Sequence, residues 1–189
     1  MLLYKDIVKE NNPVLRNKST DIEMPMSEDL LKALQEMDDY LTNGYDDEFT
    51  KKHDIRPGVG IAAPQIGINK KMFCIQAYDE KGDFHHLVVV NPKITSESEQ
   101  LTYLKGGEGC LSVEKECRGL IMRHAKIKAR CLLYNPDKNC FEQTVLTLKG
   151  YLSVIFQHEY DHLDGILFFD RVNRENPFFV PENAKPVEF

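Results

Sequence analysis

The chain has 189 residues and a formal net charge of −6, which suits one domain, over residues 1–189, around a single core. The acidic balance gives no support for broad nucleic-acid binding, which usually needs a basic face, and no direct sequence-specific contact with nucleic acid is expected. The longest apolar runs, such as residues 87–90, are far below the ~20 residues of a membrane span, and Lys5 interrupts any secretory signal, so we expect a cytoplasmic protein.

The first third of the chain predicts one clear helix between two irregular segments. We expect an N-terminal arm over residues 1–26, a helix over 27–44 and a polar loop insertion over 45–57. Ser27 suits the N-cap of this helix, and Gly44 suits the left-handed position that follows a helix. The apolar residues that recur at helical spacing are Leu30, Leu34, Met37 and Leu41.

The rest of the chain predicts strands followed by a late helix. The expected strands cover residues 71–78, 86–91, 126–135 and 141–149. Turn-forming residues at 135–139 predict a β-hairpin between the last two. A hydrophobic helix over 152–163 should end near Gly165, and the tail over 176–189, with three prolines, should be irregular. Strands followed by a helix favour a single α+β domain with antiparallel sheets over a doubly wound fold.

The cysteines do not form a disulfide pattern. Their number is odd and their spacing irregular, which favours free thiols in a reducing compartment. They are Cys74, Cys110, Cys117, Cys131 and Cys140. Cys74 and Cys131 lie in expected strands and are interpreted as small buried hydrophobes.

The late helix carries an HExxH motif from His158 to His162. Positions i and i+4 lie one turn apart on one helix face, so both imidazoles can converge on one cation. Glu159 would lie beside the metal and accept a proton from water. A chance match is the bland alternative. It is weakened by the apolar neighbours, because two unpaired histidines and a carboxylate are costly to bury without a metal.

A catalytic metal site needs a third protein ligand. The longer metzincin motif places a histidine where this chain has Phe168, which cannot ligate. Several other residues could ligate but have no supporting context: His53, His85, His86, His124, Glu175, Glu182 and Glu188. Cys110 is the better candidate, because it lies in a glycine-rich segment, with Gly106, Gly107 and Gly109 before it, that lets the backbone approach a ligand closely.

Three segments of the sequence together resemble peptide deformylase. They are residues 58–65 (GVGIAAPQ), 108–112 (EGCLS) and 157–162 (QHEYDH). Residues 12–16 (NPVLR) also resemble the Pro-x-Leu-Arg segment near the start of that family. The longer segment at 45–57 is similar to the insertion of the bacterial type 2 enzymes, often found in Gram-positive bacteria.

This resemblance implies a function and a set of site residues. Members remove the formyl group from the N-terminal formylmethionine of newly made polypeptides, so the ribosome near its exit tunnel is a possible partner. The resemblance assigns the metal to Cys110, His158 and His162, with Glu159 as the acid and base. It implies Fe²⁺ in the cell, with Zn²⁺, Ni²⁺ or Co²⁺ able to substitute.

The resemblance also assigns the groups that contact the substrate. Gln65 and the backbone N–H of Leu111 would face the formyl oxygen, and Gly60 would lie near the substrate backbone. Two alternatives stay open. One is an HExxH zinc protease, and the other is a structural metal-binding module, although Cys117 lacks the paired spacing expected of a fourth ligand.

Overall fold

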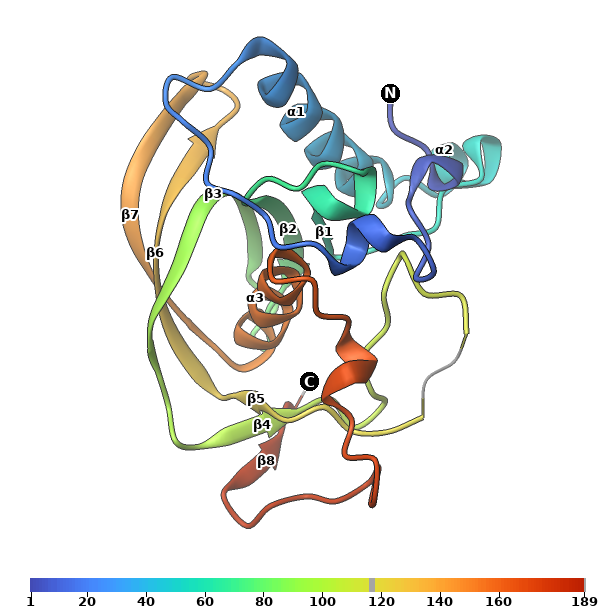
Figure 1. The fold of residues 1–189 in the computed structure, drawn as a ribbon, viewed down its shortest axis with the longest axis vertical. Helices are drawn as coiled ribbons and strands as arrows, with labels where there is room; N and C mark the ends of the chain where they lie inside the picture. The colour runs from blue at the N-terminus through green and yellow to red at the C-terminus, as the bar shows by residue number, and fades with distance from the viewer. Residues whose placement is uncertain (116–117, 189) are drawn as a thin grey trace.

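The computed structural model describes residues 1–115 and 118–188, and its centre is a five-stranded antiparallel sheet (Figure 1). The strand order is β1-β2-β3-β6-β7. The strands are β1 (Gly60–Ala62), β2 (Met72–Tyr78), β3 (Phe84–Glu97), β6 (Lys126–Asn135) and β7 (Cys140–Lys149). A smaller sheet has the order β5-β4-β8, from Arg123–His124, Leu101–Tyr103 and Ala184–Pro186. The α+β class predicted from the sequence is confirmed.

The core has two halves because β2 is covered on both faces. Alternate side chains of a strand point to opposite faces. Met72 and Cys74 accordingly join the cluster under helix α1 (Glu28–Asn43), while Phe73 and Ile75 join the cluster under helix α3 (Gly150–Leu163). Phe73 also meets Phe156 of α3 edge to face, with ring centroids 5.0 Å apart. Helix α3 therefore lies in the interior, packed against the sheet (Figure 1).

Most of the expected elements are confirmed, but the conformation predicted for Gly44 is wrong and one strand was predicted too short. The Ser27 hydroxyl accepts from the N–H of Leu30, as an N-cap should. Gly44 is right-handed, with φ −66° and ψ −18°, because its N–H still bonds back to carbonyls of the last helical turn. Strand β3 runs well beyond 86–91, because Asn91 at φ 49° accompanies a register shift that lets pairing with β6 continue.

The segments expected to be irregular contain regular structure. The 45–57 insertion forms helix α2 (Asp47–His53), because Asp46 caps its start and basic residues occupy its last turn. The arm holds two 3-10 turns, η1 (Tyr4–Asp6) and η2 (Pro13–Arg16). The tail supplies β8, which pairs in parallel with β4, so the second sheet is mixed. Among the described residues, no helix has the length and apolar character needed to cross a bilayer.

Candidate metal centre

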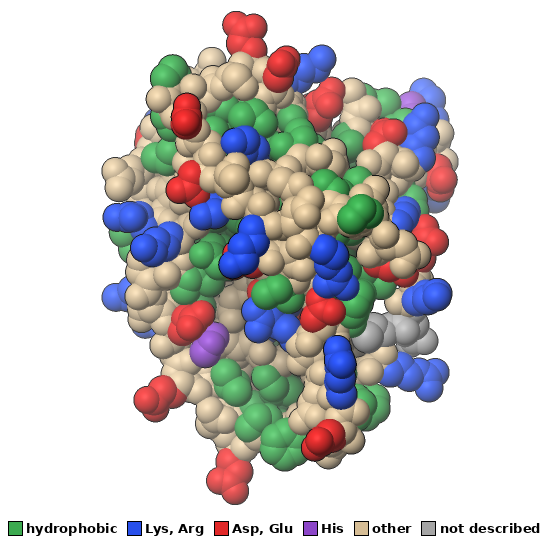
Figure 2. Space-filling model, viewed as in Figure 1, with side chains coloured by type: hydrophobic (Ala, Val, Ile, Leu, Met, Phe, Trp, Pro, Cys, Tyr) green, Lys and Arg blue, Asp and Glu red, His purple; other side chains and the backbone are tan. Residues whose placement is uncertain are grey.

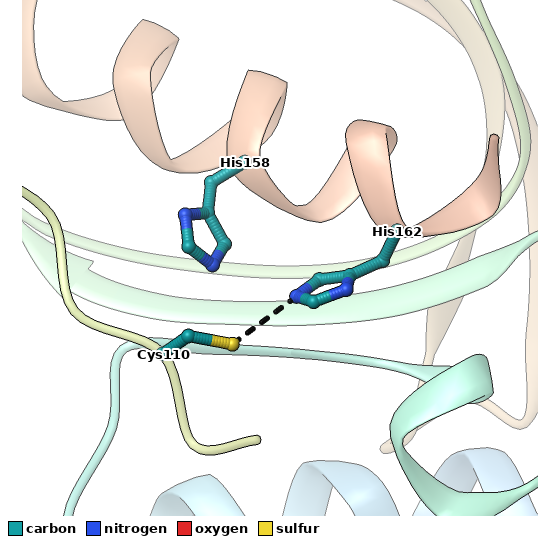
Figure 3. Close-up of side chains that lie close together, drawn as sticks. All are labelled: Cys110, His158 and His162. Atoms are coloured by element: carbon teal, nitrogen blue, oxygen red, sulfur yellow. Dashed lines mark hydrogen bonds between the residues drawn. The ribbon is translucent and has the colours of Figure 1, made fainter. Parts of the chain in front are cut away.

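Three side chains from two separate segments converge beside the C-terminal half of α3. His158 and His162 project from successive turns of this helix, and Cys110 enters from the loop between β4 and β5 (Figure 3). Their potential ligand atoms all lie within 4.8 Å of one another, and His162 Nε2 is 3.4 Å from the Cys110 sulfur. All three residues are buried. The structure therefore brings together the three ligands expected from the sequence.

The donor set fits a divalent cation. Two imidazole nitrogens and one thiolate suit zinc, iron and related ions, and three protein ligands leave a position open for a reacting group. Burial and the neighbouring His158 lower the pKa of His162, so its ring is neutral and able to ligate. Burial lowers the pKa of His158, but Cys110 and Glu108 outweigh it and raise the pKa well above its ordinary value. A cation therefore competes with a proton at His158.

Glu108 orients the first histidine. Its Oε2 atom lies 2.8 Å from His158 Nδ1, which places the proton on Nδ1 and directs Nε2 toward the cluster. Both carboxylate oxygens also accept from Arg123, at 2.8 Å each. Arg123 in turn donates to Asp161 of α3 at 2.5 Å. Burial raises the pKa of Glu108, yet the hydrogen bonds and charge of Arg123 lower it to about 2, so the carboxylate stays ionised.

The residues that orient His158, which are Glu108, Arg123 and Asp161, were not identified from the sequence. Glu108 and Asp161 lie inside the segments already singled out, which was the available signal. Arg123 lies in no such segment, and its side chain is only 1% exposed. The role of this buried arginine depends on tertiary contacts, because its two carboxylate partners lie 15 and 38 positions away in the sequence.

Glu159 is buried next to the candidate ligands. It is 3% exposed, and within the described part of the chain its Oε2 atom has no hydrogen-bond partner. Burial raises its pKa to about 7. A carboxyl with that pKa can both accept and release a proton near neutral pH.

Gly60 lies directly against the side chain of Glu159. A Cβ at position 60 would lie 2.2 Å from Glu159 Oε1 and 2.7 Å from its Cδ. Only a residue without a side chain leaves room for this carboxylate. Glycine is therefore required at position 60 to leave room for Glu159, a reason separate from the expected proximity of Gly60 to the substrate backbone.

Gln65 is aimed at the cluster from the turn after β1. Its Oε1 accepts from the N–H of Ala62 at 2.8 Å, which fixes the orientation of the amide. Its Nε2 then lies 3.5 Å from the Cys110 sulfur and 3.2 Å from the Ser112 hydroxyl. Leu111 is buried, and it lines the same cavity as Gln65. The Gln65 amide is thus oriented beside Cys110 before any substrate arrives.

A cavity of about 320 Å³ opens onto these groups. His158, Glu159, Cys110 and Gln65 lie on its wall. The apolar part of the lining is formed by Val59, Leu104, Leu111, Val154 and Ile155. The site can therefore hold an apolar side chain next to the reacting groups.

The other candidate ligands lie elsewhere in the structure. Phe168, in the position of the metzincin histidine, is buried and stacks on His158 with ring centroids 5.9 Å apart. His85 contacts Asp79 at 3.0 Å, and His86 contacts Asp38 at 2.7 Å. Both histidines lie on strand β3, where His86 is exposed and His85 is partly exposed.

The last two candidate histidines and the cysteines also have other surroundings. His124 Nδ1 bonds the Ser98 carbonyl at 2.7 Å, and the ring of His53 packs on Phe49. Cys74 and Cys131 are buried strand residues and free thiols, as predicted. Cys117 lies outside the described residues.

A model of a known protein family matches most of this chain. The model described as polypeptide deformylase matches residues 4–178. The chain belongs to the polypeptide deformylase family. It is accordingly a metal-dependent hydrolase that removes the N-formyl group from polypeptides, and the protease and binding-module alternatives are set aside.

Curated relatives cover the whole chain. A protein named peptide deformylase 2 from Bacillus cereus is 43% identical over 188 residues, spanning 100% of both chains. A peptide deformylase from Halalkalibacterium halodurans is 45% identical over 172 residues, covering 91% of this chain and 92% of the relative. The deformylase resemblance inferred from the three short segments is therefore confirmed.

Solved deformylase structures share the fold. The enzyme from Thermotoga maritima aligns with a TM-score of 0.65 at 31% identity, covering 92% of this chain and 99% of its own. A class I type b deformylase from Acinetobacter baumannii, crystallised with K1U bound, aligns with a TM-score of 0.68 at 28% identity, covering 90% and 99%. The deformylase fold thus extends over nearly all of this chain.

Proposed function

We propose that Cys110, His158 and His162 bind the divalent metal and that Glu159 moves the proton during hydrolysis of the formyl amide. The observation that carries this proposal is the convergence of the three ligand atoms within 4.8 Å, with a buried Glu159 on the same cavity wall. A cation held there would polarise the formyl carbonyl and lower the pKa of water.

The side chains divide the work of the reaction between them. Glu159, with a pKa of about 7, takes a proton from the attacking water and later gives it to the leaving amine. Gln65 Nε2 and the backbone N–H of Leu111 donate to the oxygen that becomes negative in the transition state. One such donor is typically worth ~3–4 kcal/mol there. Because Gln65 is already oriented by Ala62, little reorganisation is needed when substrate binds.

The cavity supports formylmethionine as the first residue of the substrate. Its apolar lining includes Val59, Val154 and Ile155, and the unbranched methionine side chain adapts well to such a surface. Newly made polypeptides supply this group, so the nascent chain, with the ribosome near its exit tunnel, is the proposed partner. The proposed location is the cytoplasm, in keeping with the four free thiols among the described residues. Fe²⁺ is the proposed metal in the cell.

The decisive experiment compares two substrates on the purified, metal-loaded protein. Formyl-Met peptides should be deformylated, while matched unformylated peptides should stay intact at every internal bond. Glu159→Gln should remain folded and keep its metal but lose about 10²–10⁴-fold in turnover. Cleavage of the unformylated peptide without deformylation, or normal turnover by Glu159→Gln, would overturn the assignment.

A further inference from the structure

A second cavity of about 420 Å³ opens beside the first, and its lining differs in charge. The two cavities share Arg56 and residues 107–110, so they are contiguous. The charged residues that line the second are Arg56, Lys105, Glu108, Glu114, Lys115 and Arg118. Four of these six are basic, although the chain as a whole carries a net charge of −6.

Both acidic residues of this lining are already paired. Glu108 is held by Arg123 through two hydrogen bonds of 2.8 Å. Glu114 meets Lys9 Nζ at 3.5 Å. Among the described residues that line the cavity, both carboxylates are therefore engaged and basic side chains are in excess.

The basic residues, by contrast, have open donors. Within the described residues, Arg56, Lys105 and Arg118 form no ion pair, and all three are exposed. Arg56 uses only Nη1, which donates to the Val113 carbonyl at 3.1 Å and to the Tyr4 hydroxyl at 3.4 Å. Its remaining donors face no acceptor in the described part of the chain. In Figure 2, several Lys and Arg side chains lie on the side of the molecule where Figure 1 places the segment from β4 to β5, with Asp and Glu side chains among them.

We propose that Arg56 and Lys105 form an anion-binding extension of the active site that favours substrates with Asp or Glu shortly after formyl-Met. The inference rests on the proposed function, which places the formyl group beside Cys110. An extended peptide advances about 3.3 Å per residue, and one that runs from the inner cavity into the contiguous second cavity passes the wall that carries Arg56. A guanidinium with free donors can bind a carboxylate through two parallel hydrogen bonds.

The preference should be modest and sensitive to salt. An exposed ion pair changes binding only a few-fold, and salt screens it over about 10 Å at 0.1 M and about 3 Å at 1 M. We therefore expect about a threefold higher kcat/KM for a peptide with Asp than for the isosteric peptide with Asn, with a Lys peptide lowest. The gain should appear in KM rather than kcat, because these groups do not touch the reacting atoms.

The test uses formyl-Met peptides that differ only by Asp, Asn or Lys at the second, third or fourth position, assayed at low and high salt. Arg56→Gln and Lys105→Gln should each remove most of the Asp preference while hydrolysis of the Asn peptide continues. Lys138→Gln, an exposed lysine in the hairpin turn between β6 and β7, is the matched control and should keep the preference. Product peptides with Asp or Asn provide a second readout as competitive inhibitors.

The outcomes separate this inference from the function on which it rests. Equal kcat/KM and equal inhibition for Asp and Asn peptides, with deformylation normal, would overturn the acidic preference alone. Failure to deformylate the Asn peptide would overturn the proposed function and this inference with it. Binding of an RNA oligonucleotide that is lost in Arg56→Gln, without any peptide preference, would assign the basic lining to nucleic acid instead.

Discussion

Replacing Gly60 by alanine tests whether the position of the Glu159 carboxylate determines the rate. The new Cβ would lie 2.2 Å from Glu159 Oε1, and Cβ contacts below 3.0 Å are essentially never found. Neither backbone can easily give way, because Gly60 pairs with Ile75 in the sheet and Glu159 lies on a buried helix. The side chain of Glu159 must therefore move.

The required movement is roughly 0.8 Å, from 2.2 to 3.0 Å. A misplacement of about 1 Å in a reacting group can lower a rate about 10²-fold. Glu159 also lines the substrate cavity, so the displaced carboxylate would occupy space meant for the peptide. We expect Gly60→Ala to lower kcat by about 10²-fold and to raise KM, while metal content and folding remain close to normal.

The assay is steady-state deformylation of a formyl-Met peptide, with metal content and thermal unfolding measured on the same samples. Gly106→Ala is the matched control, because a Cβ at Gly106 meets no atom within 4 Å and should leave turnover unchanged. A Gly60→Ala variant with near-normal kcat would refute the reasoning, since it would show that Glu159 can move aside without loss.

Four further expectations follow from the geometry. Cys110→Ala should lose most of its bound metal, measured by elemental analysis, together with its activity. In air, iron-loaded enzyme should lose activity faster than nickel-loaded enzyme, with mass mapping placing the first oxidation at Cys110, because ferrous iron offers a one-electron route that nickel lacks. Glu108→Gln should lower the free energy of unfolding in urea by ~3 kcal/mol and metal affinity 10–100-fold, because Arg123 loses a buried partner. The hydrogen bond to Asp38 outweighs burial and raises the pKa of His86. The pair should therefore stabilise the fold at pH 6, and this stabilisation should be lost as the pH rises through the folded-state pKa. His86→Gln should accordingly lower Tm more at pH 6 than at pH 9.

Each expectation has an outcome that contradicts it. Full metal occupancy in Cys110→Ala would remove this residue from the ligand set. Equal decay of the iron and nickel forms, or inactivation with Cys110 unmodified, would point to general denaturation. Unchanged stability of Glu108→Gln would show that Arg123 is satisfied by Asp161 alone. A His86→Gln deficit that is equal at both pH values would show that the ring contributes by packing rather than by charge.

Short-range patterns determined much of the architecture and the centre of the site. Helix α1 and strand β6 follow from side chains repeating every 3.6 and every two residues, which is a property of each segment alone. The HExxH spacing puts His158 and His162 on one face of a helix wherever that helix packs. Cys110 could be selected because its glycine-rich setting is also local. These features need no knowledge of what the segments contact.

Tertiary structure decided which groups surround that centre. Arg123 has a role only because folding brings it to Glu108 and Asp161, and Gly60 is required only because α3 packs against β1. Strand β8 forms because β4 offers it an edge, although its own sequence predicts an irregular tail. Such contacts join residues far apart in the chain, and their energies depend on burial and distance, which no local pattern contains.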